Sequence, residues 1–379
     1  MRAGQYVRQA PGYTTFHPKP LPPHPPLKID AKLSCLLSEA DLALGRLDGV
    51  STLLPNPDLF VSMYVRQEAA LSSQMAGTRS TLQDVLQFEI DSEGQGFPKD
   101  IQEVVNYVSA MKYGLECLKK RPITLRLICE VHEKLLAGVR GSDCAIGEFR
   151  TSQNWIGPPG CTLSKATFVP PPVDEMRLAL NNLEKFIYDD SLPPLIHCGL
   201  AHAQFETIHP FLDGNERVGR LLITLLLVQK QALGRPLLYL SRYVKQHRAE
   251  YYDRLMAIRN EGDWEGWLKF FLRGVQETSR DAVKTAQNIL RLREDHRRLF
   301  SEKLPTEKLL SKRHELAFLE YLFERPIVTV RMAEQHLNCA FATANKVVRR
   351  FARLGLLEEM TGFQRNRCFR FAPYLALFE

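Results

Sequence analysis

Hydrophobic positions recur every three or four residues along most of this chain, which is the period of an amphipathic helix. The pattern holds from residue 31 to about residue 120 and again over 124–136, 173–188, 192–206, 239–260 and 264–276. Residues 280–299 continue it as one long, strongly charged segment, as expected of a helix that connects two domains. The pattern therefore predicts a mainly α-helical protein.

Two segments interrupt the helical period. Six prolines from Pro18 to Pro26 exclude helix and central strand, so we expect residues 1–30 to run extended over the surface. Between residues 141 and 172, glycines and prolines separate short β-prone pieces at 151–156 and 166–169. Such pieces are typical of a β-hairpin, and we predict a flap at about residues 156–169.

Residues 305–379 have a different pattern. Helical stretches at 309–323, 330–337 and 342–354 precede two β-prone pieces at 355–360 and 367–371, with a turn at 361–362. Three helices followed by a two-stranded wing is the winged-helix pattern, whose recognition helix can enter the major groove of DNA. The polar residues on or near that helix would be Thr343, Asn345, Lys346, Arg349, Arg350 and Arg353. Because winged helices also mediate protein contacts, the sequence leaves DNA and protein as alternative partners.

The composition narrows the class of protein. The chain has 379 residues, 45% of them hydrophobic and 25% charged, which suits a soluble protein of two or three domains. No apolar run approaches the ~18–20 residues of a membrane span, and the N-terminus lacks the apolar core of a signal peptide. The eight cysteines are scattered without zinc-site spacing, so we expect reduced thiols and a cytoplasmic location. The net charge of +7 fits an acidic partner or a solvated basic surface equally well.

Residues 209–220, HPFLDGNERVGR, concentrate the groups that polyphosphate chemistry needs. A turn that opens a helix directs unpaired N–H groups and the positive end of the helix dipole at an anion, and the apolar run at 221–227 predicts a buried helix. Arg217 and Arg220 can fork onto phosphate oxygens, and Asp213 is a hard oxygen ligand for Mg²⁺. His209 can take a proton from an attacking hydroxyl. The segment predicts a site for a nucleoside triphosphate.

The same twelve residues resemble the signature of the Fic family, HPFx(D/E)GN(G/K)RxxR. The flanking residues 147–150, 167–172 and 205–208 extend the similarity. Fic proteins mostly transfer AMP from ATP to a protein hydroxyl. The resemblance therefore implies a Fic-type helical core that uses ATP and Mg²⁺.

The resemblance also implies a role for each motif residue. His209 would be the general base and Asp213 the magnesium ligand, while Phe211 would anchor the loop in the core. Gly214, Asn215 and Glu216 would supply backbone N–H groups for phosphate, with a further contact from the Asn215 side chain. Arg217 and Arg220 would hold the β- and γ-phosphates.

Further roles follow from more distant segments. The flap would pin a segment of the target protein by strand pairing and present its hydroxyl to His209. Tyr251, Tyr252 and Asn260 resemble the nucleotide-base pocket of related proteins, although tyrosines on a helix are more often core residues. We interpret His197 and His202 as structural or surface residues, because no cysteine or carboxylate pairs with them at metal-ligand spacing.

One departure from the family pattern concerns regulation. Many Fic proteins carry an inhibitory helix with the pattern (S/T)xxxE(G/N), whose glutamate pairs with the second motif arginine, Arg220 here. This chain has Ser72 and Gly77 in the matching frame, but position 76 is alanine. The inhibitory helix lacks its carboxylate, so we expect Arg220 to be free for phosphate.

The second departure is Glu216, where the family normally has Gly or Lys. A carboxylate at the phosphate site should repel the nucleotide. Glu216 also lies four residues before Arg220, the spacing of a helical ion pair, and could partly replace the missing inhibitory glutamate. The alternative is that its side chain points to solvent and only its backbone N–H matters.

Taken together, these patterns predict an organisation and a function. We expect an N-terminal helical region at 1–110, a Fic core at 111–275, a linker helix at 276–304 and a winged-helix domain at 305–379. The expected function is AMP transfer from ATP–Mg²⁺ to a Ser, Thr or Tyr hydroxyl of a target protein and of the chain itself. The alternatives are transfer of another nucleotide, removal of AMP, and a DNA-binding regulator with a degenerate Fic core. No membrane partner is expected; a homodimer is one assembly that we consider.

Overall fold

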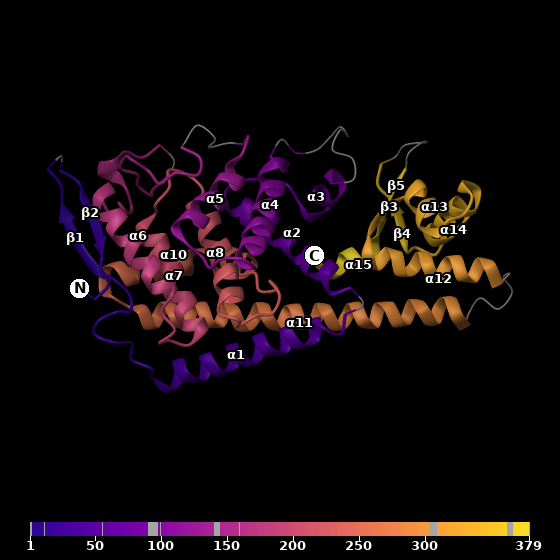
Figure 1. Cartoon of the computed structure of the whole chain (residues 1–379), viewed down its shortest axis with the longest axis horizontal. Helices are drawn as coiled ribbons and strands as arrows, with labels where there is room; N and C mark the ends of the chain where they lie inside the picture. Colours follow the sequence, from indigo (N-terminus) through magenta and orange to yellow (C-terminus); the bar gives the residue numbers. More distant parts are fainter. Residues whose placement is uncertain are drawn as a thin grey trace. The chain divides into compact units, whose positions relative to one another are not determined.

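The computed structural model describes residues 2–10, 12–54, 56–89, 98, 100–139, 145–158, 160–302, 309–361 and 367–378 (Figure 1). The chain divides into two compact units. The first contains the residues up to Asp48, Val65–Phe88 and the residues that lead up to Arg280, and the second contains Gly49–Tyr64 and the residues from Asp281 onwards. Three helices continue from one unit into the other: α1 (Ala31–Ser51), α2 (Pro57–Met75) and α11 (Trp264–Glu302).

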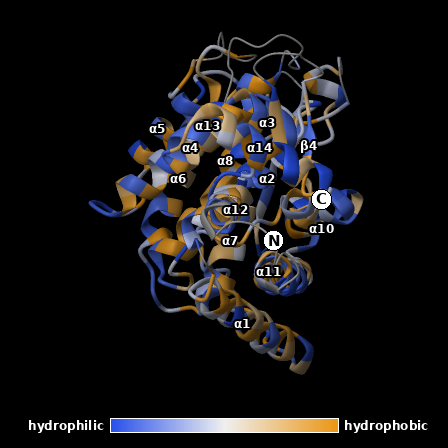
Figure 2. Cartoon of the chain, turned by 90° about the vertical axis from the view of Figure 1, so that its right-hand side faces the viewer, coloured by the Kyte–Doolittle hydropathy of each residue, from blue (hydrophilic) through white to orange (hydrophobic). Residues whose placement is uncertain are grey.

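The first unit is almost entirely helical, as the hydrophobic period predicts. Its remaining helices are α3 (Leu82–Phe88), α4 (Ile101–Leu118), α5 (Leu125–Leu136), α6 (Val173–Ile187), α7 (Pro194–Ile208), α8 (Asn215–Gln229), α9 (Ser241–Gln246) and α10 (Arg248–Glu261). Apolar and charged residues alternate around the long helices α1 and α11, which show mixed orange and blue turns in Figure 2. The charged helix predicted at 280–299 is the C-terminal part of α11.

Helices α7 and α8 form the core of this unit. Every residue of α7 from Leu195 to Ile208 is buried, and α8 is buried over most of its length, including the predicted apolar run at 221–227. The two histidines of α7 are satisfied inside the protein. His197 bonds to the Phe186 carbonyl at 2.7 Å, and His202 bonds to the Gly219 carbonyl at 3.0 Å. Both are structural residues, as expected.

The N-terminal residues contain a hairpin that the sequence pattern did not predict. Strands β1 (Gly4–Arg8) and β2 (Thr14–Pro18) pair antiparallel, and the Phe16 N–H donates to the Val169 carbonyl of the flap at 3.0 Å. Residues 19–30 follow without helix or strand, as the prolines require. The prediction of an extended chain over residues 1–30 was based on the proline cluster. The β-prone residues Tyr6, Val7 and Phe16 lie before most of these prolines and form the hairpin.

The predicted flap is present in a reduced form. One antiparallel bridge joins Ile156 to Phe168, with N···O distances of 2.8 and 3.0 Å. A single 3₁₀ turn, η1 (Leu163–Lys165), lies between them. A longer ladder does not form, because Pro158 has no N–H to donate and Gly160 takes a left-handed φ of 76°.

The second unit has the helix and strand order predicted for a winged helix. Its elements are α12 (Leu309–Glu324), β3 (Ile327–Thr329), α13 (Val330–Leu337), α14 (Phe341–Arg353), β4 (Leu357–Glu359), β5 (Cys368–Phe371), α15 (Ala372–Leu375) and η2 (Ala376–Phe378). The sheet order is β3-β5-β4 and both pairings are antiparallel. The strands β4 and β5 are the two predicted strands of the wing, and β3 is an additional strand. The short strand β3 was missed, although its three residues IVT are all β-branched. The predicted turn residue Gly362 lies outside the described residues.

In the part of the chain that the structure describes, no helix combines the length and apolar character needed to cross a lipid bilayer.

Candidate functional site

The motif 209–220 joins the end of α7 to the start of α8. His209 and Gly214 both take left-handed conformations, with φ of 48° and 79°, and these two turns reverse the chain. The Asn215 side chain closes the loop: its Oδ1 accepts from the Phe211 N–H at 2.8 Å and its Nδ2 donates to the Phe211 carbonyl at 2.7 Å. Phe211 thus engages both ends of the amide, and the expected phosphate contact of this side chain stays a prediction. Phe211 is buried, as predicted.

The base of the flap is tied to the same loop. The His209 carbonyl accepts from Arg150 Nε and from Asn154 Nδ2, both at 3.1 Å. Arg150 is buried and also donates to the Pro171 carbonyl at 2.5 Å. These contacts fix the position of the flap relative to His209. Neither residue was predicted as part of the site, although Arg150 belongs to the flanking segment 147–150.

A second histidine, His132 of α5, contacts the motif loop through a hydrogen bond and a ring contact. His132 Nδ1 accepts from the Gly147 N–H at 3.0 Å, so its proton lies on Nε2, which donates to the Asp213 carbonyl at 3.0 Å. Its ring stacks on Phe211 with centroids 3.8 Å apart. Burial lowers the pKa of His132 to about 4, so it is a neutral positioning residue at pH 7. No sequence pattern indicated this role beyond the place of His132 on an amphipathic helix.

His209 itself is half-buried and neutral at physiological pH. Burial lowers its pKa to about 4, against the attraction of the Glu216 carboxylate, and nearby Arg259 and Arg150 add to the lowering. A neutral imidazole has a free lone pair, so His209 can accept a proton.

The first turn of α8 is open towards an anion. Gly214 occupies the N-cap position, and among the described residues no side chain caps the helix. The N–H groups of the first turn and the positive end of the helix dipole are therefore available. This is where the glycine turn predicts phosphate to bind, although the Gly214 N–H is bonded to Asp213 Oδ1 at 2.6 Å in this structure.

Asp213 lies at the edge of this site. Its Oδ1 accepts from the Gly214 N–H at 2.6 Å, and its Oδ2 is 3.7 Å from Arg217 Nη2. The side chain is 41% exposed, so its oxygens can face a bound ion. No group of three or more His, Cys, Asp or Glu side chains forms a metal cage among the described residues. A lone accessible carboxylate fits Mg²⁺, which usually binds one or two carboxylates, water and substrate phosphates.

Arg217 is directed into the protein. Its guanidinium is 2% exposed and pairs with the buried Glu103 of α4 at 3.1 Å. A buried arginine without this partner would carry an uncompensated charge, so the pair fixes the arginine beside the phosphate site. Glu103 was not predicted, because it lies more than a hundred residues away in the sequence.

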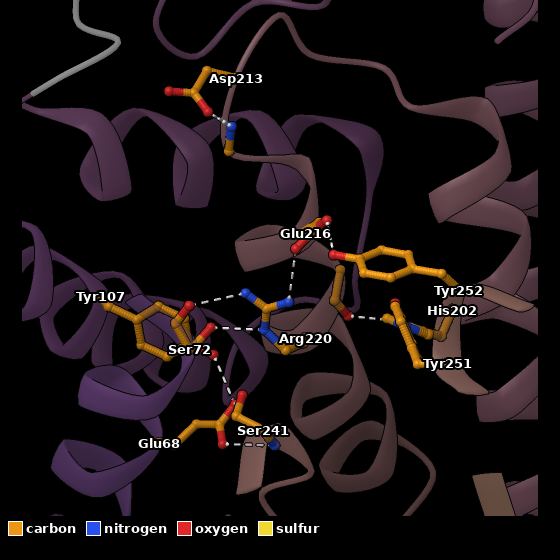
Figure 3. A network of polar contacts seen from close by, with 12 residues as sticks. Glu68, Ser72, Tyr107, His202, Asp213, Glu216, Arg220, Ser241, Tyr251 and Tyr252 are labelled. Atoms are coloured by element: carbon orange, nitrogen blue, oxygen red, sulfur yellow. Dashed lines mark hydrogen bonds and ion pairs between the residues drawn. The ribbon is translucent and has the colours of Figure 1, made fainter. Parts of the chain in front are cut away.

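Arg220 is engaged on two sides (Figure 3). Its Nε donates to Ser72 Oγ at 2.8 Å and its Nη2 to the Ser72 carbonyl at 3.1 Å. Its Nη1 pairs with Glu216 Oε2 at 3.5 Å, and Glu216 Oε1 accepts from the Tyr252 hydroxyl at 2.8 Å. The expectation that Arg220 is free is therefore wrong, because Ser72 and Glu216 bind it although Ala76 lacks a carboxylate.

The helix end that carries Ser72 is itself held by buried polar contacts. Glu68, one turn before Ser72 on α2, accepts from the Ser241 hydroxyl at 2.5 Å and from the Tyr107 hydroxyl at 3.2 Å (Figure 3). Helix α2 ends at Met75, and Ala76 and Gly77 follow, the latter with φ of 104°. The structure thus brings the predicted regulatory segment to Arg220 through its serine.

Two carboxyl groups near Arg220 differ in their protonation state. Burial alone would raise the pKa of Glu216, but Arg220 and the Tyr252 hydroxyl outweigh it and hold the pKa below its ordinary value. Burial, and then repulsion from Glu216, raises the pKa of Glu206 to about 8. Its Oε1 lies against Gly219, where a Cβ would approach it to 2.3 Å. At pH 7 Glu216 is ionised and Glu206 is protonated.

The three predicted base-pocket residues each have a different hydrogen-bond partner, and their role in binding a base stays a prediction. Tyr251 is buried and bonds to His202 at 2.9 Å, so it belongs to the core. Tyr252 reaches Glu216 at the phosphate site. The Asn260 amide oxygen accepts from the Tyr6 hydroxyl of the N-terminal hairpin at 2.7 Å.

A different residue of α10 faces the flap. The Arg259 guanidinium lies over the Phe168 ring, 3.7 Å from its centroid, and donates to the Glu206 carbonyl at 3.2 Å. Its place next to the predicted Asn260 was the nearest sequence signal. Arg259 links the flap to the end of α7.

Comparison with known proteins agrees with this geometry. Residues 35–116 match the model of the Fic/DOC family N-terminal region, and residues 122–227 match that of the Fic/DOC family. The protein adenylyltransferase Fic of Drosophila grimshawi is 31% identical over 208 residues, 54% of this chain and 38% of that protein. Its counterpart in Aedes aegypti is 32% identical over 201 residues, 52% and 36%. The matches thus span little more than a third of each curated relative.

Solved structures show the same fold at lower identity. A Fic family protein from Desulfovibrio desulfuricans G20 has a TM-score of 0.61 and 20% identity, over 91% of this chain and 97% of that one. A Fic domain-containing signalling protein from Bacteroides thetaiotaomicron has a TM-score of 0.50 and 17% identity, over 68% and 97%. At these identities the likeness supports the fold alone.

Proposed function

This chain is a Fic domain protein, and on that premise we propose that it transfers AMP from ATP to a hydroxyl group of a target protein and of itself. The observation that carries the proposal is the neutral His209 beside the open first turn of α8. One group accepts a proton and the other binds phosphate, and nucleotidyl transfer to a hydroxyl needs both.

The reaction is a displacement at the α-phosphorus. The target hydroxyl gives its proton to His209 as its oxygen forms the new bond to the α-phosphorus. The bond between the α-phosphorus and the bridging oxygen breaks, and pyrophosphate leaves with that oxygen. The N–H groups at the start of α8 bind the phosphates in place, and the pairs formed by His132 and Asn215 keep the loop rigid.

Asp213 is the residue that would hold Mg²⁺. When bound, the ion would offset the negative charge that builds up on the phosphates. Arg217, fixed by Glu103, contributes positive potential beside the same site without leaving its partner.

The target segment would lie along the flap. Apart from the bridge between Ile156 and Phe168 and the bond from the Phe16 N–H to the Val169 carbonyl, the flap forms no strand ladder among the described residues. An extended peptide can pair with such an edge and bring a Ser, Thr or Tyr hydroxyl to His209. Arg150 and Asn154 set the distance between this edge and the base.

We propose further that Glu216 restrains this activity. Its carboxylate occupies Arg220, the arginine expected to hold the γ-phosphate, and adds a negative charge where phosphate must bind. Nucleotide binding would have to displace Arg220 from Glu216 and Ser72. The restraint comes from within the motif and does not need a glutamate at position 76.

The test is incubation of the chain with each nucleoside triphosphate labelled at the α-phosphate, with Mg²⁺ and a cell lysate. We expect incorporation from ATP, including into the chain itself, with the modified residues located by mass spectrometry. His209→Asn is the decisive variant, because asparagine tolerates the left-handed conformation but is not a base. It should abolish incorporation, as should His209→Ala, whereas His24→Ala, at an exposed position, should not.

Each other outcome has a clear meaning. Preferential incorporation from another nucleotide would replace ATP as the substrate. No incorporation from any nucleotide, by wild type or by Glu216→Gly, would contradict the proposal. Label that persists in His209→Asn would assign the base to another group.

A further inference from the structure

Helix α14 has one buried face and one cationic face. The buried face faces the interior of the second unit and consists of Ala344, Val347, Val348 and Phe351. Lys346, Arg349 and Arg353 are exposed, and among the described residues they form no ion pair. Their spacing of three and four residues places them in one stripe along the helix. No acidic residue occurs in α14.

A fourth cation shows how this face differs from an ordinary charged surface. Arg350 pairs with Glu315 of α12 at 3.2 Å, and the carboxylate is 3% exposed. This pair anchors the helix from the inner side. The other three cations have no such structural use.

The preceding elements hold α14 in a helix-turn-helix. Thr329 caps α13 by accepting from the Met332 N–H at 3.2 Å, and Asn338 ends it in a left-handed conformation with φ of 45°. The chain then turns through Cys339 and Ala340 into α14. In this arrangement the second helix is the one presented to a groove.

After the exposed Phe341, the first turns of α14 carry small and amide side chains. Ala342 is exposed, and Thr343 and Asn345 are partly exposed. Small residues allow close approach to base edges, and an asparagine amide can pair with adenine. The acidic residues of the neighbouring wing are engaged elsewhere: Arg370 pairs with Glu358, and Thr361 bonds to Glu359.

We propose that α14 of the second unit binds duplex DNA, with Lys346, Arg349 and Arg353 on phosphates and Asn345 facing the bases. An acidic protein could also bind cations, but it would not require the small residues at the start of the helix. The proposal is independent of AMP transfer, because it uses no residue of the 209–220 motif.

The experiment measures binding of the full chain to a fluorescent duplex by anisotropy over a series of salt concentrations. The triple variant Lys346→Ala, Arg349→Ala, Arg353→Ala should bind about tenfold more weakly or worse, and its plot of log K against log salt should be shallower by about 3. The matched control removes three exposed cations of α11, Lys284→Ala, Arg291→Ala and Arg298→Ala, and should keep the wild-type slope. Asn345→Ala should keep the slope but relax the preference among duplexes selected from a random pool.

Three outcomes would overturn the proposal. They are no binding by wild type at low salt, equal loss in both triple variants, and binding of an acidic peptide but not DNA through α14. His209→Asn must bind DNA as wild type does, so failure of the transfer reaction and failure of this proposal are distinguishable.

Discussion

At the scale of single residues, Glu216 places a carboxylate at the predicted phosphate site. The sequence allowed two interpretations of the Glu216 side chain: it points to solvent, or it pairs with Arg220 along the helix. The side chain is 31% exposed and bonds to both Arg220 and Tyr252. The geometry therefore supports the helical pair with Arg220. Because the pair lies at the start of α8, the same carboxylate that stabilises the arginine also opposes an incoming anion.

The first prediction concerns Glu216→Gln. The amide keeps the shape but removes the charge, so Arg220 loses its ion pair, keeps only its contacts to Ser72, and the predicted phosphate site becomes more positive. We expect the KM for ATP to fall and kcat/KM to rise on the order of tenfold, equivalent to about 1.4 kcal/mol. Glu216→Gly should act in the same direction. Glu116→Gln, which removes one partner of an exposed pair with Lys119, is the matched control. Unchanged ATP kinetics in both Glu216 variants would refute the restraint.

The second prediction concerns the protonated Glu206. Its pKa is about 8 in the folded chain and near 4.5 when unfolded. Between these values the folded state keeps a proton that the unfolded state has lost, so stability must fall as pH rises from about 4.5 to 8. Glu206→Gln has no such proton, and its Tm should decline less than that of wild type. Thermal unfolding at pH 5, 6.5 and 8 measures the difference; parallel curves would show that Glu206 is not buried as an acid.

At the scale of elements, the end of α2 is the part of the first unit that binds Arg220 across from Glu216. The sequence placed the inhibitory function in one glutamate, and its absence predicted a free Arg220. The structure shows that the serine of the same pattern supplies two contacts, through Ser72 Oγ and the Ser72 carbonyl. A helix end can hold a guanidinium with its own carbonyl, because the last carbonyls of a helix lack intrahelical partners.

The third prediction restores the family residue with Ala76→Glu. Position 76 lies one turn beyond Ser72, so a glutamate there can reach Arg220 from the α2 side. We expect transfer activity to fall about tenfold further, with a higher KM for ATP. The double variant with Glu216→Gln should remain inhibited, because either carboxylate can occupy Arg220. Ala76→Gln is the uncharged control, and an equal loss in that variant would indicate a packing effect instead.

The elements also show how far the sequence could predict this protein. Long helices and the motif turn followed from local patterns, because period and turn chemistry depend on neighbouring residues. Strands β1 and β2 were missed because the proline cluster decided the interpretation of residues 1–30, and β3 was missed because it lies between two predicted helices. Arg150, Asn154, Glu103 and Arg259 were missed because their partners are distant in sequence. A single sequence carries no record of such pairing.

At the scale of the whole molecule, the boundary between the units does not fall at one point in the chain. Gly49–Tyr64, between α1 and the rest of α2, belongs to the second unit together with the residues after Asp281. Leu54 and Phe60 are buried there. The Phe60 ring lies 4.7 Å from that of Tyr64 and 6.3 Å from that of Phe378. The second unit is thus built from segments that lie far apart in the sequence.

The fourth prediction follows from this interleaving. A chain that stops after Arg280 keeps Leu54 and Phe60 but loses the residues that bury them, which forgoes about 3–6 kcal/mol of apolar burial. We expect it to aggregate and to bind a hydrophobic dye. Leu54→Ser with Phe60→Ser should restore solubility to the shortened chain, because serine removes the exposed apolar surface. The same pair of changes should destabilise the full chain, where both side chains are buried. Size-exclusion chromatography of the shortened chain and urea unfolding of the full chain measure the two effects. Opposite effects of this double substitution would establish that the segment Gly49–Tyr64 completes the second unit. Equal effects would show that this segment and the residues after Asp281 fold independently.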